Sequence, residues 1–91
     1  MDDQSIVRTV QDAVTSCEGV ARLTSPLGIA GRSIKLSKSA AGLGLDVYIK
    51  VVYGENIPRL SWTVQTRIRE ALESSKQKLS GINIHVQGVE R

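Results

Sequence analysis

The residues of this chain that could do catalytic or metal chemistry are few and widely spaced. His85 is the only histidine and Cys17 the only cysteine, so one chain cannot form a His and Cys cluster of zinc-site spacing. A lone imidazole needs a second group to orient it as a base, and we expect His85 to be a solvated residue on a polar sheet face. Cys17 is predicted to be a small buried hydrophobe. No catalytic residue, metal or cofactor is expected, and the chain is predicted not to be an enzyme.

Three glycine segments resemble ligand-binding loops. Gly28-Ile29-Ala30-Gly31 has the spacing of a nucleic-acid GxxG loop, but it lies between two predicted strands, where a hairpin is expected. Gly42-Leu43-Gly44 resembles the start of a dinucleotide fingerprint, yet no third glycine follows and a strand comes next. The segment from Gly54 to Pro58 could cradle a phosphate. Because Pro58 removes an N–H donor and Glu55 adds negative charge, we expect a plain corner instead.

Composition restricts the class of protein. The chain has 91 residues, 41% of them hydrophobic, which suits one domain over residues 1–91. A core built without phenylalanine favours tight packing over a roomy pocket, so no small-molecule substrate is expected. The net charge of +3 is scattered. The N-terminus does not resemble a signal peptide and no apolar run is long enough to cross a bilayer, so we expect a cytoplasmic protein.

Hydrophobic periodicity predicts six elements. An apolar stripe at helical spacing covers two segments, and alternation or β-branched residues mark four others. We expect helices over Gln4–Cys17 and Ile57–Leu79, and strands over Val20–Thr24, Ser33–Leu36, Leu45–Tyr53 and Gly81–Val89. Ser25–Gly28 reads as a turn and Lys38–Gly44 as a flexible connection.

The order of these elements predicts an α+β fold. Each helix has one stripe to bury and the sheet has one apolar face, so both helices should pack on that face of a small mixed sheet. The inward residues are expected to be Leu45, Val47, Ile49, Val51 and Tyr53, with Ile82, Ile84 and Val86 on the last strand. The result is a two-layer sandwich of order α-β-β-β-α-β with an open polar face.

Trp62 is the first candidate for a contact surface. It lies roughly 200° around the second helix from Leu60, opposite the apolar stripe. Its ring could lie flat against Pro58, Arg59 or Arg69, or it could anchor a protein interface, since Trp and Arg concentrate in binding hot spots. The predicted interaction ridge comprises Trp62, Arg59, Thr66, Arg69 and Glu73.

The open sheet face is the alternative surface. A face of this kind could bind RNA or single-stranded nucleic acid, with Tyr48 stacking on a base while Lys35 and Lys50 contact phosphates. The residues predicted to gather there are Arg22, Lys35, Tyr48, Lys50 and His85.

Several motifs together resemble one family. They are Tyr53-Gly54-x-x-Ile57-Pro58-x-Leu60, Val64-Gln65, Ile68, Ala71-Leu72-Glu73, the closing run Ile82–Val89, and a first helix leading into Glu18-Gly19-Val20-Ala21. Over nearly the whole chain this pattern is similar to the alkaline shock protein family of bacterial envelope stress response proteins.

The resemblance implies a non-enzymatic cytoplasmic protein that self-associates and lies beneath the bacterial membrane by binding a membrane-anchored partner. The motif residues would then define the fold or face partners, without catalysing a reaction. Two functional classes remain open: a scaffold or interaction domain of the envelope stress type, and a nucleic-acid-binding module that uses the basic sheet face.

Overall fold

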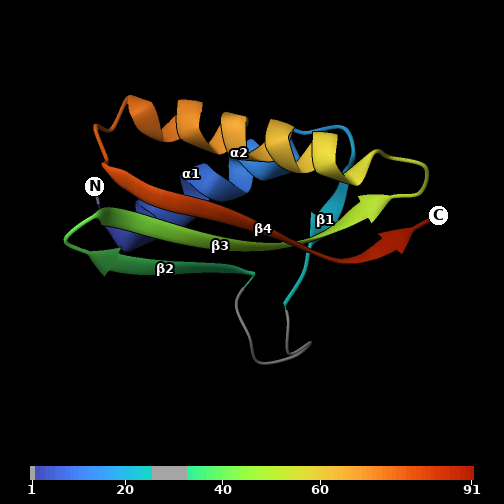
Figure 1. Cartoon of the computed structure of the whole chain (residues 1–91), viewed down its shortest axis with the longest axis horizontal. Helices are drawn as coiled ribbons and strands as arrows, with labels where there is room; N and C mark the ends of the chain where they lie inside the picture. Colours follow the sequence, from blue (N-terminus) through green and yellow to red (C-terminus); the bar gives the residue numbers. More distant parts are fainter. Residues whose placement is uncertain (1, 26–32) are drawn as a thin grey trace.

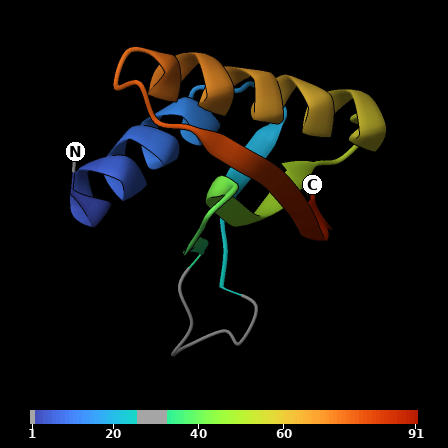
Figure 2. The same cartoon turned by 60° about the vertical axis from the view of Figure 1, so that its left-hand side comes forward.

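The protein is a two-layer α+β sandwich in which both helices cover one face of a four-stranded sheet (Figures 1 and 2). The computed structural model describes residues 2–25 and 33–91. The elements are α1 (Asp3–Thr15), β1 (Val20–Leu23), β2 (Ile34–Ser39), β3 (Gly42–Val52), α2 (Ile57–Glu73) and β4 (Leu79–Glu90). The predicted fold class and element order are therefore confirmed. The predicted turn at Ser25–Gly28 and the Gly28–Gly31 motif fall wholly or mostly outside the described residues.

The sheet is built around β3. Strand β4 pairs with one edge of β3 in parallel, while β1 and β2 both pair antiparallel with its other edge, end to end. Tyr48 marks the junction, because its carbonyl accepts from Thr24 N–H at 2.9 Å and its own N–H donates to Ser33 O at 2.8 Å. The expected hairpin between β1 and β2 is therefore wrong. A strand as long as β3 accommodates two short partners along the same edge.

The apolar stripes of the helices meet the inward face of β3. Ile6, Val10 and Val14 of α1 are buried, as are Leu60, Val64, Ile68 and Leu72 of α2. They pack on Leu43, Leu45, Val47, Ile49 and Val51 of β3. Ile84 and Val86 of β4 are only partly buried against this core, which leaves that side of the molecule less well covered.

The segment from Gly54 to Pro58 is a corner, as predicted. Gly54 has φ of +93°, a left-handed conformation that side chains disfavour. Asn56 then caps α2, since its Oδ1 accepts from Arg59 N–H at 3.1 Å. Pro58 lies in the first helical turn, where its missing N–H costs little. Strand β3 has ended at Val52 before this turn, so Tyr53 is 62% exposed, and its predicted inward position is wrong.

Two other predicted boundaries were wrong. Helix α2 ends at Glu73 and not at Leu79, because Lys76 takes a positive φ of 57° and the chain reverses into β4. The expected flexible connection at Lys38–Gly44 is a tight hairpin, in which β2 runs to Ser39 and β3 begins at Gly42. Gly42 makes this possible with φ of +125°.

Candidate interaction surfaces

The predicted ridge lies on the outer side of α2. Because the buried stripe of α2 faces the sheet, Trp62, Arg59, Arg69 and Glu73 are exposed and Thr66 is partly exposed. The Trp62 side chain is 66% exposed. Within the part of the chain that the structure describes, the cations found over aromatic rings are Lys35 over Tyr48 and Arg91 over Tyr53. Neither Arg59 nor Arg69 is among these cations, and two thirds of the Trp62 side chain faces water.

A shallow hollow continues the ridge toward the C-terminal end of α2. Its volume is about 320 Å³. Three of the residues that line it, Thr66, Arg69 and Glu73, belong to the ridge. The other lining residues are Glu70, Gln77 and Leu79. The ridge and the hollow together give α2 a contoured surface of mixed charge, with one large aromatic side chain.

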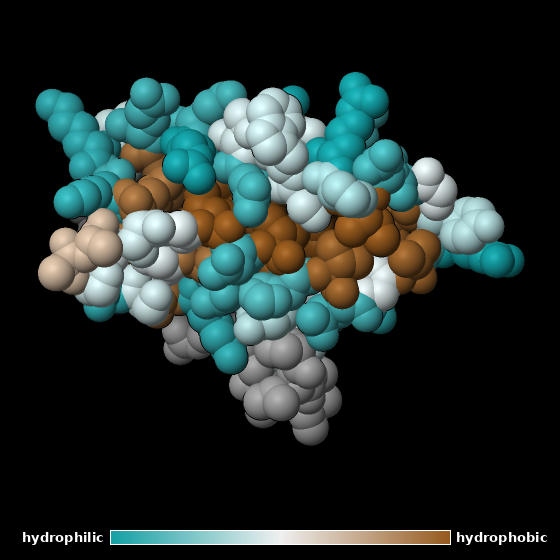
Figure 3. Space-filling model, in the orientation of Figure 1, coloured by the Kyte–Doolittle hydropathy of each residue, from teal (hydrophilic) through white to brown (hydrophobic). Residues whose placement is uncertain are grey.

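An apolar band lies beside this ridge. Figure 3 shows hydrophobic atoms running across the molecule between α2 and β4, with polar side chains above and below. The hydrophobic residues that remain partly or largely exposed at α2, β4 and the adjoining end of β3 are Val52, Ile57, Leu79, Ile84, Val86 and Val89. A band of this kind along one side of a small domain is typical of a protein contact surface.

The five residues predicted for the open face are brought together there by the strand register. Arg22 pairs with Lys50, and Tyr48 pairs with His85. Lys35 lies on the same face, since its partner Asp46 is two residues from Tyr48 on β3. The face is partly basic, but it also carries Asp46 and Glu90, whose carboxylates were not among the five predicted contact residues.

The Tyr48 ring on this face already packs against two neighbouring side chains. Tyr48 and His85 stack with ring centroids 4.5 Å apart and planes 15° from parallel. The Lys35 ammonium lies 5.6 Å from the Tyr48 ring centroid. A nucleic-acid base would have to displace a neighbour before stacking on Tyr48.

Asp46 and Glu90 neutralise part of the positive charge. Asp46 Oδ1 lies 2.9 Å from His85 Nε2, and Arg22 Nε lies 2.6 Å from Glu90 Oε1. His85 is thus on the polar face as predicted, but it is oriented by a partner and is not simply solvated. The alternation of β3 places Asp46 on this face, whereas its contact with His85 depends on strand pairing, which a single sequence does not reveal.

These groups do not form a catalytic constellation. An Asp–His pair can orient a general base, but a nucleophile must also lie within hydrogen-bond reach. The hydrogen bonds of residues 2–25 and 33–91 include none from His85 to a serine, threonine or cysteine. Cys17 is 5% exposed, and burial raises the pKa of its thiol, although the Arg67 charge opposes that shift. Nor do His, Cys, Asp and Glu in the described ranges form a group of three able to hold a metal.

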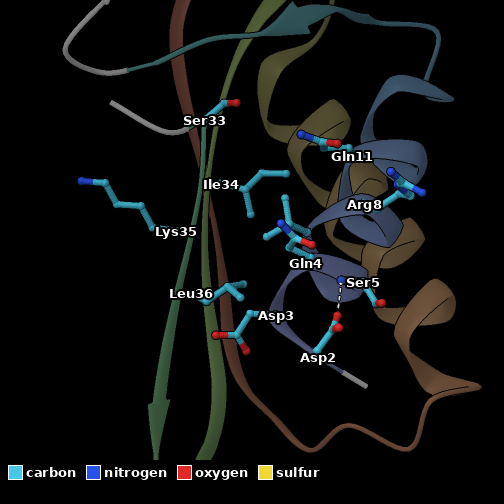
Figure 4. A pocket seen from close by; sticks show the side chains of 11 residues that line it. Asp2, Asp3, Gln4, Ser5, Arg8, Gln11, Ser33, Ile34, Lys35 and Leu36 are labelled. Carbon is cyan, nitrogen blue, oxygen red and sulfur yellow. Dashed lines mark hydrogen bonds between the residues drawn. The ribbon is translucent and has the colours of Figure 1, made fainter. Parts of the chain in front are cut away.

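A second hollow lies between α1 and β2 and is an open groove (Figure 4). Its volume is about 930 Å³. The two carboxylates at its end already have structural partners. Asp2 Oδ1 accepts from Ser5 N–H at 2.8 Å as the cap of α1, and Asp3 pairs with Lys38 at 2.8 Å. The Ser5 N–H also lowers the pKa of Asp2. Lys35 points away from α1 in this view.

Solved structures share the fold. A copper form of MamM CTD matches with a TM-score of 0.70, covering 97% of this chain and 87% of that one at 10% identity. Another MamM CTD structure matches with a TM-score of 0.68, covering 96% of this chain and 95% of that one at 12% identity. At this identity the likeness extends to the fold alone. Among the described residues, no helix is long and apolar enough to cross a membrane.

Sequence comparison identifies the family. The protein YqhY of Bacillus subtilis (strain 168), an uncharacterised protein, is 33% identical over 61 residues, which are 66% of this chain and 45% of YqhY. The chain thus matches less than half the length of that relative. The model of the alkaline shock protein 23 family, described as having a cell envelope-related function, matches residues 1–91. The chain therefore belongs to the alkaline shock protein 23 family, whose function is related to the cell envelope.

Proposed function

We propose that the protein is a non-enzymatic envelope stress response protein. It acts as a cytoplasmic scaffold or interaction domain that self-associates and binds a membrane-anchored partner. The exposed ridge of α2 is the contact surface. The observation that carries this proposal is the two-thirds exposure of Trp62 on a helix whose opposite side is fully buried.

The physical argument concerns the cost of leaving such a side chain in water. A tryptophan ring is large and apolar, and covering it at an interface yields more than covering most other side chains. Arg59 and Arg69 flank it on the exposed side of α2 and can pair with carboxylates of a partner. The apolar band beside the ridge supplies further area to bury.

The non-enzymatic part of the proposal has separate support. The family is one with a cell envelope-related function and is not known as enzymatic. The groups best suited to chemistry, His85 and Cys17, lie on opposite faces of the sheet, one on the open face and one in the core.

The first test is sedimentation velocity across protein concentration, at low and high salt. The wild-type protein should associate with little dependence on salt, because the proposed contact is mainly apolar, and Trp62→Ala should lose that association. Tyr53→Ala is the matched control, since Tyr53 is an aromatic of similar exposure, 62%, away from the ridge. A protein that stays monomeric at every concentration, or equal loss in both variants, would refute the role of the ridge.

The second test concerns the membrane-anchored partner. Binding of the purified protein to native bacterial membrane vesicles should be lost in Trp62→Ala and after protease treatment of the vesicles. Protein-free vesicles containing phosphatidylglycerol separate a protein partner from direct attraction of this basic chain to anionic lipid. Equal binding to the protein-free vesicles would contradict the proposal.

The nucleic-acid alternative has its own outcome in the same experiments. If Trp62→Ala associates normally, and a single-stranded RNA oligonucleotide binds with an affinity that falls steeply between about 50 and 200 mM salt, the open face is the functional surface. The occupied Tyr48 ring and the carboxylates Asp46 and Glu90 argue against that outcome.

A further inference from the structure

Strand β4 forms an unpaired edge of the sheet with few charged residues. It is the longest strand and pairs only with β3 among the described strands, so its other side faces outward. Proteins usually protect such edges with charged residues. Strand β2, on the opposite side of the sheet, carries Lys35 and Lys38, whereas β4 has no Lys, Arg, Asp or Glu from Leu79 to Val89. The β4 edge is therefore open to another strand.

The peptide groups that β4 directs outward can be identified from the pairing. Residues of β3 that bond to β4 alternate along the strand, beginning with Leu43, whose N–H donates to Lys78 O at 2.7 Å. In a parallel pair, the β4 residue directly opposite such a position points its own N–H and C=O away. Those opposite residues are Leu79, Ile82, Ile84, Val86 and Val89. The outward carbonyl of Ile82 agrees, since it accepts a 2.8 Å hydrogen bond from the Gln65 side chain of α2.

The spacing of these five outward residues along β4 is symmetric about Ile84. The irregularities in the β3–β4 register, one near each end, make the steps three, two, two and three residues. When the β4 strands of two copies pair antiparallel about Ile84, each of the five outward residues lies opposite an outward residue of the other copy. A register displaced by two residues would place outward groups of one copy opposite inward groups of the other.

We propose that β4 pairs antiparallel with β4 of a second copy of this chain about a two-fold axis at Ile84, which makes one continuous sheet. This deepens the self-association in the proposed function and rests on it. Leu79 then lies opposite Val89 of the second copy, and Ile82 lies opposite Val86. A carbonyl has two lone pairs, so Ile82 O can accept from Val86 of the second copy while it keeps its bond to Gln65.

Charge complementarity supports the same register. Lys78 precedes the strand and Glu90, which also pairs with Arg22 of its own chain, ends it. The pairing about Ile84 places Lys78 and Glu90 opposite each other in both halves of the dimer. Directly opposed residues of unlike charge stabilise antiparallel pairs, and like charges destabilise them. The interface is isologous, so every contact occurs twice.

The helix layer brings Trp62 to the same axis. Gln65 lies over Ile82, and Ile84 is about 6.6 Å further along the strand, which corresponds to about four residues of helix. Since α2 runs antiparallel to β4 (Figure 1), this displacement leads back toward Trp62. Trp62 is also only about 60° around the helix axis from Gln65. The Trp62 side chains of the two copies therefore lie at the level of the two-fold axis, on the outer side of the helix layer.

A disulfide trap tests the register. An antiparallel hydrogen-bonded pair has Cα atoms about 5.5 Å apart, within the range of a disulfide. Ile84→Cys in a Cys17→Ala background should therefore form a covalent dimer under mild oxidation, as seen on a non-reducing gel. Ser80→Cys in the same background is the control, because Ser80 is exposed but faces position 88 of the second copy. Cross-linking of Ile84→Cys no faster than of the control would overturn the proposal.

Charge reversal gives an independent readout. Lys78→Glu should weaken the dimer about threefold at low salt, because it would stand opposite Glu90 of the second copy. No effect of Lys78→Glu would also overturn the register. If wild-type protein associates through Trp62 but the β4 variants have no effect, this inference fails and the proposed function stands. If the wild type never associates, both fail.

Discussion

Replacement of Trp62 by alanine should lower the free energy of unfolding of the monomer only modestly. A tryptophan side chain can bury about 150–250 Å², and here only about a third of it is covered, so roughly 50–80 Å² is at stake. At about 25 cal/mol per Å² that is at most about 1–2 kcal/mol. Alanine recovers part of it through its higher helix propensity, about 0.5 kcal/mol. We therefore expect a loss of about 0.5–1.5 kcal/mol.

The assay is urea unfolding followed by far-UV circular dichroism at low protein concentration. Fluorescence would not serve, since Trp62 is the only tryptophan. Ile68→Ala is the reference variant, because Ile68 is 0% exposed on the same helix and should cost about 2–5 kcal/mol. If Trp62→Ala costs 2 kcal/mol or more, the ring packs within the monomer, and any loss of association in that variant would reflect the fold and not the contact surface.

Four further substitutions test backbone strain and titration. Gly42→Ala should cost about 2–4 kcal/mol in the same assay, because its Cβ would lie 2.5 Å from a backbone oxygen at φ of +125°. Gly54→Ala should cost only about 1 kcal/mol, since nothing lies within 4 Å of its Cβ, and equal costs would contradict the geometry. The lowered pKa of Asp2 gives stability that is present above the ordinary value of 3.8 and is lost as pH falls through the folded-state pKa. Asp2→Asn keeps the helix cap but cannot titrate, so it should flatten the acid side of the plot of stability against pH. The raised pKa of Cys17 gives stability that is present below the ordinary value of 9.0 and is lost as pH rises through the folded-state pKa. Cys17→Ala should therefore flatten the alkaline side of the stability profile. An unchanged profile in either variant would refute this link between pKa and stability.

The types of the helices and strands could be predicted from hydrophobic periodicity because each element buries one side. The stripe of Leu60, Val64 and Ile68 and the alternation of β3 both record which side chains meet the core. The end of α2 could not be found in the same way, since Ser75 and Leu79 continue the helical spacing by chance. Only the backbone at Lys76, with its positive φ, shows where the helix stops.

Pairing between distant segments was the harder part. Two short strands separated by glycines suggest a hairpin on local grounds, and nothing local indicates that both would add to the same edge of β3. The contacts of Asp46 with His85 and of Glu90 with Arg22 depend on that pairing. Helix geometry alone, by contrast, placed Trp62 opposite the buried stripe, because no long-range information is needed to decide which way a residue of α2 points.

The topology explains why the ridge and the β4 edge fall on one side of the molecule. Strands β3 and β4 are parallel, so the chain must cross back between them, and α2 makes that crossing over the face that it buries. Strand β4 is added after the crossing and lies outside β3, so one flank of α2 comes to lie above the outer side of β4, as the bond from Gln65 to Ile82 records. A side chain on that flank and an outward peptide group of β4 are then neighbours by construction. In the proposed dimer, Trp62 and Ile84, 22 positions apart in sequence, belong to one surface for this reason. The order of the elements in this fold thus brings one helix flank and one sheet edge to the same side of the molecule.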